Sequence, residues 1–291
     1  MLPLSHPFRR PAQGAGLLLS LLLGTACTEN KTPDIPAPVV VPAATNADAR
    51  DYAQYTEMVW GDEFNGAGPV DGTKWAYDTG GGGWGNNELE TYTTSTDNVF
   101  QNGGNLIIQA VKSGSSYTSG RILTKGKQNF QYGRYDVRAK LPKGQGIWPA
   151  IWMLGSDIDQ NNWPKCGEID IMELRGQNPT EFLTTMHFGN DGASHKQAGV
   201  DHIRTPSSAS LADDFHVYSA VRSKDQIRFY LDGTLYYTFT SNDASPYPFN
   251  NNFFGVLNVA VGGNFLGNPD GSTVFPQQMQ VDYVRYYQYK Q

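Results

Sequence analysis

The sequence predicts an all-β protein, built either as a sandwich of two sheets or as a barrel. Short segments that alternate apolar and polar residues recur along the chain, with turn residues between them. The composition combines 32 glycines and 12% aromatic residues with only 17% charged residues, which suits many strands joined by tight turns. No amphipathic pattern is long enough to predict a substantial helix. Many short strands within one domain are typical of sandwiches and barrels.

The first element of the chain is an export signal, which we assign to residues 1–26 as a signal peptide of the lipoprotein type. Arg9 and Arg10 form a basic region, and LLLSLLLG (17–24) is an apolar run too short to span a membrane. The small residues before Cys27 resemble the lipobox of bacterial lipoproteins, although Gly24 stands where leucine is usual. The prediction is a lipid anchor on Cys27; ordinary signal cleavage near the same place is the alternative. A lipidated Cys27 would leave Cys166 without a disulfide partner.

A flexible linker is expected next, in residues 27–50, because this stretch is rich in Pro, Ala, Thr and Asn and lacks periodicity. Residues 51–291 then form one folded domain without an internal repeat. The formal net charge is −6 and the chain has no basic run, so nothing suggests a nucleic-acid partner. A neutral partner fits this aromatic-rich chain better than a polyanion. We expect the protein to be a monomer.

The strands of the domain are predicted from their alternation, which has a period of two. In chain order they are NLIIQAVK (105–112), GRYDVRAKL (133–141), GIWPAIWML (146–154), GEIDIMEL (167–174), FLTTMHFG (182–189), FHVYSAVRS (215–223), QIRFYLDGTLYYTF (226–239) and VDYVRYYQY (281–289). Within the seventh segment, Asp232-Gly233 separates two alternating runs and predicts a tight hairpin turn.

One of these strands, GEIDIMEL, carries three carboxylates: Glu168, Asp170 and Glu173. Burying like charges this close together is unfavourable unless they are paired or one of them holds a proton. Glu168 and Asp170 share a face because successive side chains alternate, whereas Glu173 would point the other way. Glu173 joins them only through a β-bulge, and we expect Met172 to be the displaced residue.

A line of carboxylates that shares a proton suits retaining glycoside hydrolysis. In that reaction one carboxylate attacks the anomeric carbon and a second, protonated one assists the leaving oxygen. Two long Glu side chains can lean toward each other across this strand, and Asp170 can bridge them. From the residues alone two alternatives stay open: a calcium site, because hard cations bind oxygen ligands, and a solvated strand face.

The segment WPKCGEIDIMELRG (163–176) resembles the active-site strand of glycoside hydrolase family 16, and its inserted Met172 resembles the laminarinase branch, the endo-1,3-β-glucanases. The resemblance implies a jelly-roll β-sandwich of two curved antiparallel sheets, with a substrate cleft on the concave face. It implies that Glu168 is the nucleophile, that Asp170 assists and that Glu173 is the acid/base. Other similar stretches follow in the expected order: WGDEF (60–64), WGNNELETYT (84–93), GGNLIIQA (103–110), YGRYDVRAKLPKGQGIWPAIWMLG (132–155), MHFG (186–189), FHVYSAVRSKDQIRFYLDG (215–233), NVAVGGNFLG (258–267) and DYVRYYQ (282–288).

Aromatic and amide residues near the triplet are the candidate substrate-binding groups. Trp148 and Trp152 are four residues apart and share a strand face, where they either pack in the core or stack against pyranose rings. Trp163 follows a polar loop just before Glu168 and is interpreted as a wall of the ligand site. The resemblance adds contacts to the sugar or to the acid/base from Asn86, Arg134, His187 and Asn258.

A structural calcium site on the convex side is also implied by the resemblance. Its side-chain ligand would be Asp282, completed by backbone carbonyls near Glu63 and Gly104. This calcium would contribute stability only, because hydrolysis by two carboxylates needs no cofactor.

The function that these observations predict is a retaining endo-1,3-β-glucanase acting on laminarin-type β-glucans. The enzyme would be exported and lipid-anchored to the bacterial cell envelope, facing the periplasm or the exterior. One alternative is a relative acting on mixed-linkage 1,3-1,4-β-glucan. Another is a non-catalytic β-glucan-binding protein of the same fold, although such proteins typically lack the two catalytic Glu residues, which are present here.

Overall fold

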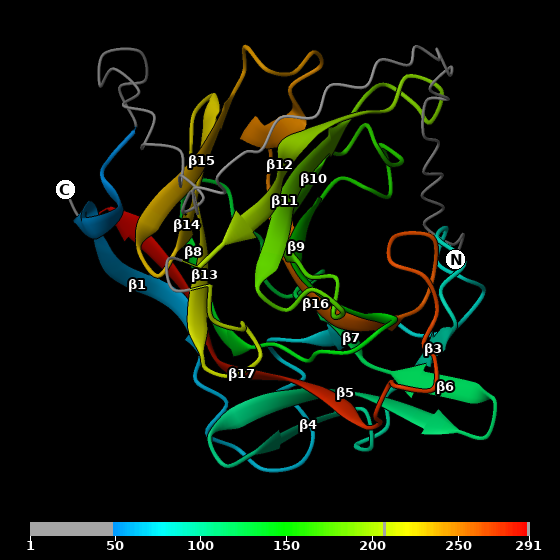
Figure 1. The fold of residues 1–291 in the computed structure, drawn as a ribbon. Helices are drawn as coiled ribbons and strands as arrows, with labels where there is room; N and C mark the ends of the chain where they lie inside the picture. Colours follow the sequence, from blue (N-terminus) through cyan, green and yellow to red (C-terminus); the bar gives the residue numbers. More distant parts are fainter. Residues whose placement is uncertain (1–48, 206–207, 290–291) are drawn as a thin grey trace, which may run out of the picture.

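The computed structural model describes residues 49–205 and 208–289, which fold into two β-sheets packed face to face (Figure 1). The predicted signal peptide, the lipidation site Cys27 and nearly all of the predicted linker lie outside the described residues. Within the described part of the chain, no helix is long and apolar enough to cross a membrane. Its two helical segments are single 3₁₀ turns, η1 (Tyr52–Gln54) and η2 (Pro248–Asn250).

The larger sheet has ten strands. Its path is β15 (Thr234–Thr240), β14 (Gln226–Leu231), β13 (His216–Ser223), β8 (Gly133–Lys140), β17 (Gln277–Tyr289), β5 (Asn105–Ser113), β6 (Ser116–Ser119) and β3 (Glu90–Tyr92), with β1 (Tyr55–Asp62) beside β17 and β4 (Val99–Asn102) beside β5. The predicted antiparallel sandwich is confirmed, with β3 and β6 as a parallel pair within it.

The smaller sheet has seven strands, all antiparallel to their neighbours. Its order is β12 (Lys196–Arg204), β11 (Glu181–Phe188), β10 (Glu168–Glu173), β9 (Ile147–Gly155), β16 (Phe253–Val261), β7 (Arg121–Leu123) and β2 (Ala76–Tyr77). In Figure 1, β9, β10, β11 and β16 lie side by side in this sheet.

The core lies between the two sheets, and it explains the nearly continuous apolar run of β9. All nine residues of this strand are buried. Ile151 and Met153 belong to the core between the sheets, whereas Trp148 and Trp152 line a pocket on the opposite face. The smaller sheet is therefore covered on one side by the larger sheet and hollowed into a pocket on the other.

Every segment predicted as a strand forms one, with small shifts at its ends. The Asp232-Gly233 turn joins β14 to β15 with φ of 50° and 77°, so the predicted hairpin is confirmed. Strand β16, FFGVLNVAV, was not predicted. It is buried at all nine positions, and burial on both faces removes the alternation that marks a strand.

Candidate active site

A pocket lies over the central strands of the smaller sheet, on the face directed away from the core. Strands β9, β10 and β16 supply most of its floor, with further residues from β7, β11 and the loop before β3. It is lined by Trp84, Asn86, Glu88, Arg121, Trp148, Ala150, Trp152, Glu168, Asp170, Glu173, His187, Asn258 and Ala260. All three carboxylates of the acidic strand are therefore on one face, as predicted.

A β-bulge brings Glu173 to that face. The pairings of β10 with β9 and with β11 are both irregular between Asp170 and Glu173. On the β9 side Asp170 pairs with Trp152 and Met172 pairs with Ile151, which leaves Ile171 as the extra residue. The predicted bulge is confirmed, but the expectation that Met172 is the displaced residue is wrong on this side of the strand.

The core holds both residues of the bulge. Ile171 and Met172 are fully buried between the sheets. The carbonyl of Ile171 accepts a hydrogen bond of 3.1 Å from the hydroxyl of Tyr236, on β15 of the larger sheet. Two consecutive residues thus point into the core, and this resets the alternation so that Glu173 follows Asp170 onto the pocket face.

Glu173 is the carboxyl group most clearly arranged to hold a proton. Its side chain is buried, and Oε1 accepts a hydrogen bond of 3.1 Å from the indole Nε1 of Trp148. Burial, followed by the negative charge of Asp170 and then that of Glu168, raises the pKa of Glu173 well above its ordinary value. His187 and the Trp148 bond act in the opposite direction. Such a carboxyl group suits a general acid at neutral pH.

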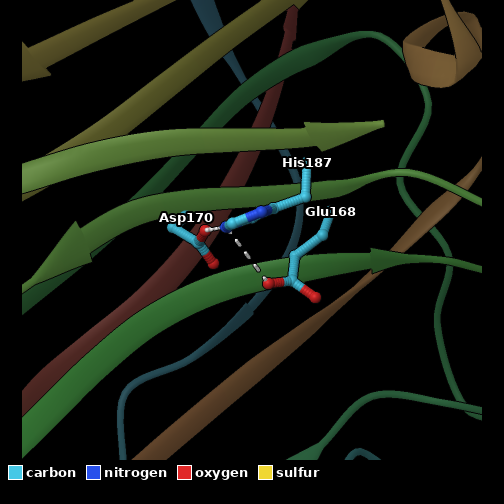
Figure 2. Close-up of side chains that lie close together, drawn as sticks. All are labelled: Glu168, Asp170 and His187. Atoms are coloured by element: carbon cyan, nitrogen blue, oxygen red, sulfur yellow. Dashed lines mark ion pairs between the residues drawn. The ribbon is translucent and has the colours of Figure 1, made fainter. Parts of the chain in front are cut away.

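The side chains of Glu168, Asp170 and His187 lie close together (Figure 2), and all three line the pocket. Nε2 of His187 lies 3.2 Å from Oδ2 of Asp170 and 3.8 Å from Oε1 of Glu168. Burial and the charge of Glu168 raise the pKa of Asp170 well above its ordinary value. Carboxyl groups this close and this buried oppose one another's ionisation, which separates their chemical roles.

The predicted amides lie at the other side of the pocket and are held by hydrogen bonds. The indole Nε1 of Trp152 donates to Oδ1 of Asn258 at 2.7 Å, and Nδ2 of Asn258 donates to the hydroxyl of Tyr92 at 3.0 Å. Nδ2 of Asn86 donates to Oε1 of Glu88 at 3.0 Å. These bonds fix the orientation of each amide and hold Trp152 with its indole N–H turned toward β16.

Arg121 is a pocket residue that the sequence reasoning missed. Its guanidinium lies 4.7 Å from the ring centroids of both Trp84 and Trp152, and its Nε lies 3.2 Å from a carboxylate oxygen of Asp78. A guanidinium between two indoles gains cation–π attraction from both rings, and this one lines the pocket. Nothing in the local sequence Arg-Ile-Leu distinguishes this position, since β7 has only three residues.

Trp163 and Arg134 are not among the residues that line the pocket. The Trp163 ring packs against His195 and His187, with centroid distances of 4.6 and 6.0 Å. Arg134 lies on β8 of the larger sheet, stacked between Tyr52 and Tyr287. The expectation that Arg134 binds substrate in the cleft is wrong, because β8 belongs to the sheet on the other side of the core.

The side chains predicted near the calcium site form ion pairs. Oδ2 of Asp282 lies 2.6 Å from a guanidinium nitrogen of Arg138, and both carboxylate oxygens of Glu63 accept hydrogen bonds from Arg285. Among the described residues, the group of three acidic or histidine side chains close enough to share an ion is Glu168, Asp170 and His187. Oδ2 of Asp282 therefore already has a cationic partner in Arg138.

An acidic strand on the floor of an aromatic and polar pocket, with a carboxyl group of raised pKa beside two others, is typical of a glycoside hydrolase of the two-carboxylate class. The sequence supports this assignment, because residues 86–285 match the family described as Glycosyl hydrolases family 16. The chain belongs to glycosyl hydrolase family 16. Hydrolases of this family need no cofactor for catalysis.

The relatives and solved structures that match this chain each cover about four-fifths of it. The chain is 42% identical over 258 residues to glucan endo-1,3-beta-glucosidase A1 of Niallia circulans, an alignment that covers 79% of this chain and 37% of that protein. The laminarinase structure from Rhodothermus marinus superposes with a TM-score of 0.72 at 39% identity, covering 81% of this chain and 98% of that one. The structure of SCLam, described as a non-specific endo-beta-1,3(4)-glucanase, gives a TM-score of 0.71 at 37% identity, covering 84% and 95%. This chain thus corresponds to about a third of the Niallia protein and to nearly all of the two solved chains.

Proposed function

We propose that this protein is a retaining endo-1,3-β-glucanase that hydrolyses laminarin-type β-glucans by double displacement. The observation that carries the proposal is the bulge in β10, which places Glu168, Asp170 and Glu173 on the pocket face. Relatives named for action on 1,3-β-glucan support the choice of substrate.

In the first step Glu168 attacks the anomeric carbon, and Glu173 gives its proton to the leaving oxygen. The bond between the anomeric carbon and that oxygen breaks as the ester to Glu168 forms. The raised pKa of Glu173 keeps the proton available at neutral pH. Asp170 lies near both groups, with Oδ2 3.2 Å from Nε2 of His187, and its role is to keep the nucleophile in place.

In the second step the same geometry reverses the role of Glu173. Esterification removes the negative charge of Glu168, which is one of the causes that raise the pKa of Glu173. The pKa of Glu173 therefore falls, and its carboxylate takes a proton from the water that attacks the ester. The product keeps the anomeric configuration of the substrate, and both carboxyl groups return to their starting states.

Substrate would lie along the aromatic side of the pocket. Trp148, Trp152 and Trp84 present ring surface there, and pyranose C–H groups pack well on indole. Asn86, His187 and Asn258 supply the polar contacts that fix the ring orientation. Trp163 packs against His187 and does not line the pocket, so it is expected to support His187 and not to contact the sugar.

A mixed-linkage substrate is a second candidate, favoured by the solved relative described as a non-specific endo-beta-1,3(4)-glucanase. A non-catalytic glucan-binding role is disfavoured because both Glu168 and Glu173 are present and line the pocket.

Release of reducing sugar from laminarin, lichenan, agarose and carboxymethylcellulose tests the assignment. Laminarin is expected to be the best substrate, and a preference for agarose would contradict the proposal. Glu168→Ala is expected to lose hydrolysis and to regain turnover with azide, giving a glycosyl azide of inverted configuration. Near-normal activity of Glu168→Ala would exclude Glu168 as the nucleophile.

The proposal also covers the location of the protein. It is exported, monomeric and anchored to the cell envelope through a lipid on Cys27. The apolar run followed by small residues and Cys27 supports it. Full-length protein should need detergent for extraction, and Cys27→Ser should release it. Recovery of the wild-type protein in soluble form with an unmodified N-terminus would contradict the anchor, and a dimer in sedimentation would contradict the monomer.

The structural calcium near Glu63, Gly104 and Asp282 stays a prediction that rests on the family resemblance. Binding would require Asp282 to share its carboxylate with Arg138. Thermal unfolding with calcium and with a chelator tests it: a higher melting temperature with calcium, lost in Asp282→Asn, would support the site. Equal melting temperatures with calcium and with the chelator would contradict the calcium site.

A further inference from the structure

His195, in the loop between β11 and β12, contacts the histidine of the pocket. Its Nε2 lies 2.9 Å from Nδ1 of His187, a hydrogen-bond distance. The two rings are nearly parallel, with an interplanar angle of 20° and centroids 5.1 Å apart. Trp163 packs against the His195 ring at 4.6 Å. His195 does not line the pocket, so it reaches the reacting groups only through His187.

The partners of His187 decide which of its nitrogens carries the proton. Nε2 faces Oδ2 of Asp170 at 3.2 Å and Oε1 of Glu168 at 3.8 Å. Each of these oxygens accepts a hydrogen bond whether its group is ionised or carries its proton on the other oxygen. A neutral His187 that donates from Nε2 has a lone pair on Nδ1. The group opposite Nδ1 is Nε2 of His195, which must then be the donor.

We propose that His195 is a positioning residue for hydrolysis, whose Nε2–H holds His187 in the tautomer that donates to Asp170. This inference rests on the proposed function, since it assigns His195 to the same reaction. The chain of donors runs from His195 through His187 to Asp170, the carboxylate between the nucleophile and the acid/base. It also gives Trp163 a role, because the indole supports the His195 ring from outside the pocket.

Loss of His195 would remove the group that selects the tautomer of His187. The groups that face His187 are Glu168 and Asp170 on β10, His195 on the loop before β12, and Trp163 on the loop before β10. Without the His195 donor, a neutral His187 can carry its proton on Nδ1 instead of Nε2. Nε2 would then direct a lone pair toward Oδ2 of Asp170, and that carboxyl group would lose the N–H that faces it.

Two substitutions separate hydrogen bonding from packing. His195→Gln keeps an N–H donor without the ring, whereas His195→Phe keeps a ring for Trp163 without the donor. We expect His195→Phe to lower kcat on laminarin by about tenfold to a hundredfold, by analogy with the loss of the hydrogen-bond partner of a metal-bound histidine. KM should change little, so that the loss appears in kcat. His195→Gln should recover most of the lost kcat.

Equal kcat values for the two variants, or a better enzyme in His195→Phe, would overturn the proposal and leave His195 a packing role. Nitrogen-15 NMR of His187 in the substrate-free wild-type protein provides a readout that needs no activity. The Nε2–H tautomer is expected, and an Nδ1–H tautomer would overturn the inference. Failure to hydrolyse laminarin would instead remove the proposed function and leave the NMR result standing.

Discussion

Two arginines, Arg121 and Arg134, have nearly the same surroundings in opposite sheets. Arg121 stacks between Trp84 and Trp152 and pairs with Asp78, on the pocket side of the smaller sheet. Arg134 stacks between two tyrosines at 4.2 and 4.3 Å and pairs with Asp136 at 3.0 Å in the larger sheet. A stacked, paired arginine is therefore not in itself a mark of a binding site. What distinguishes the two is the face of the sandwich on which each lies.

The largest expected difference between the two sheets comes from their buried carboxyl groups. Glu173→Gln in the pocket should lower kcat on laminarin by about 10²- to 10⁴-fold, because it removes the proton donor and keeps the side-chain volume. Asp136→Asn in the larger sheet should keep kcat and lower the melting temperature, because it weakens the pair between the buried Asp136 and the half-buried Arg134. Steady-state kinetics and thermal unfolding of both variants measure this. A comparable loss of kcat in Asp136→Asn would show that the two sheets are not functionally distinct.

The arginines themselves provide the next test. Arg121→Lys should raise KM for laminarin by about tenfold, since an ammonium group cannot stack flat between two indoles or present a planar N–H edge. Arg134→Lys should leave kcat/KM unchanged and reduce only stability. Kinetics with a soluble 1,3-β-glucan oligosaccharide gives both values. Unchanged KM in Arg121→Lys would mean that Arg121 only supports the tryptophans.

The features that could be predicted from the sequence are those that a few consecutive residues determine. Alternation of apolar and polar residues located the longer strands. Because side chains alternate between the two faces of a strand, Glu168, Asp170 and Glu173 could share a face only through a bulge, which the structure contains. Asp232-Gly233 was enough to place a hairpin. These features depend on a few consecutive residues, so a single sequence contains the information.

The rest depends on long-range pairing, which no local pattern encodes. Arg121 reaches the pocket because the three-residue strand β7 pairs with β16, and β16 itself lacks alternation. His195 reaches His187 through a loop whose path is set by the β11–β12 pairing. The displaced residue was misassigned because Ile171 and Met172 are both apolar and both enter the core. Only the partner strands decide between them.

The dependence of stability on pH gives a further test of the pocket. Its expected effect is smaller, and the raised pKa of Glu173 determines its direction. The pKa of Glu173 is raised in the folded state by burial, Asp170 and Glu168, so unfolded chains release this proton more readily. The contribution of Glu173 to stability is therefore fully present below its ordinary pKa of 4.5 and is lost as pH rises toward the folded value. Glu173→Gln should match the wild-type melting temperature near pH 4 and exceed it by about 2–4 °C at pH 8, if the gain is about 1 kcal/mol. An equal difference at both pH values would mean that the raised pKa is not the cause.

The smallest expected effect comes from single indole hydrogen bonds in the two regions. Trp148 donates to Oε1 of Glu173 at 3.1 Å, and this bond lowers the pKa of that acid against the effect of burial. Trp148→Phe keeps an aromatic wall and removes the donor. The pKa of Glu173 should rise, and the alkaline limb of kcat/KM should move to higher pH by less than about one unit. Trp75→Phe is the matched control, because Trp75 donates to Oδ2 of Asp62 at 2.8 Å and neither residue lines the pocket. Its pH profile should be that of the wild type. The alkaline limb could instead stay in place in Trp148→Phe, or move equally in both variants. Either result would mean that the indole hydrogen bond does not set the pKa of Glu173. That pKa would then depend on burial and the neighbouring carboxylates alone.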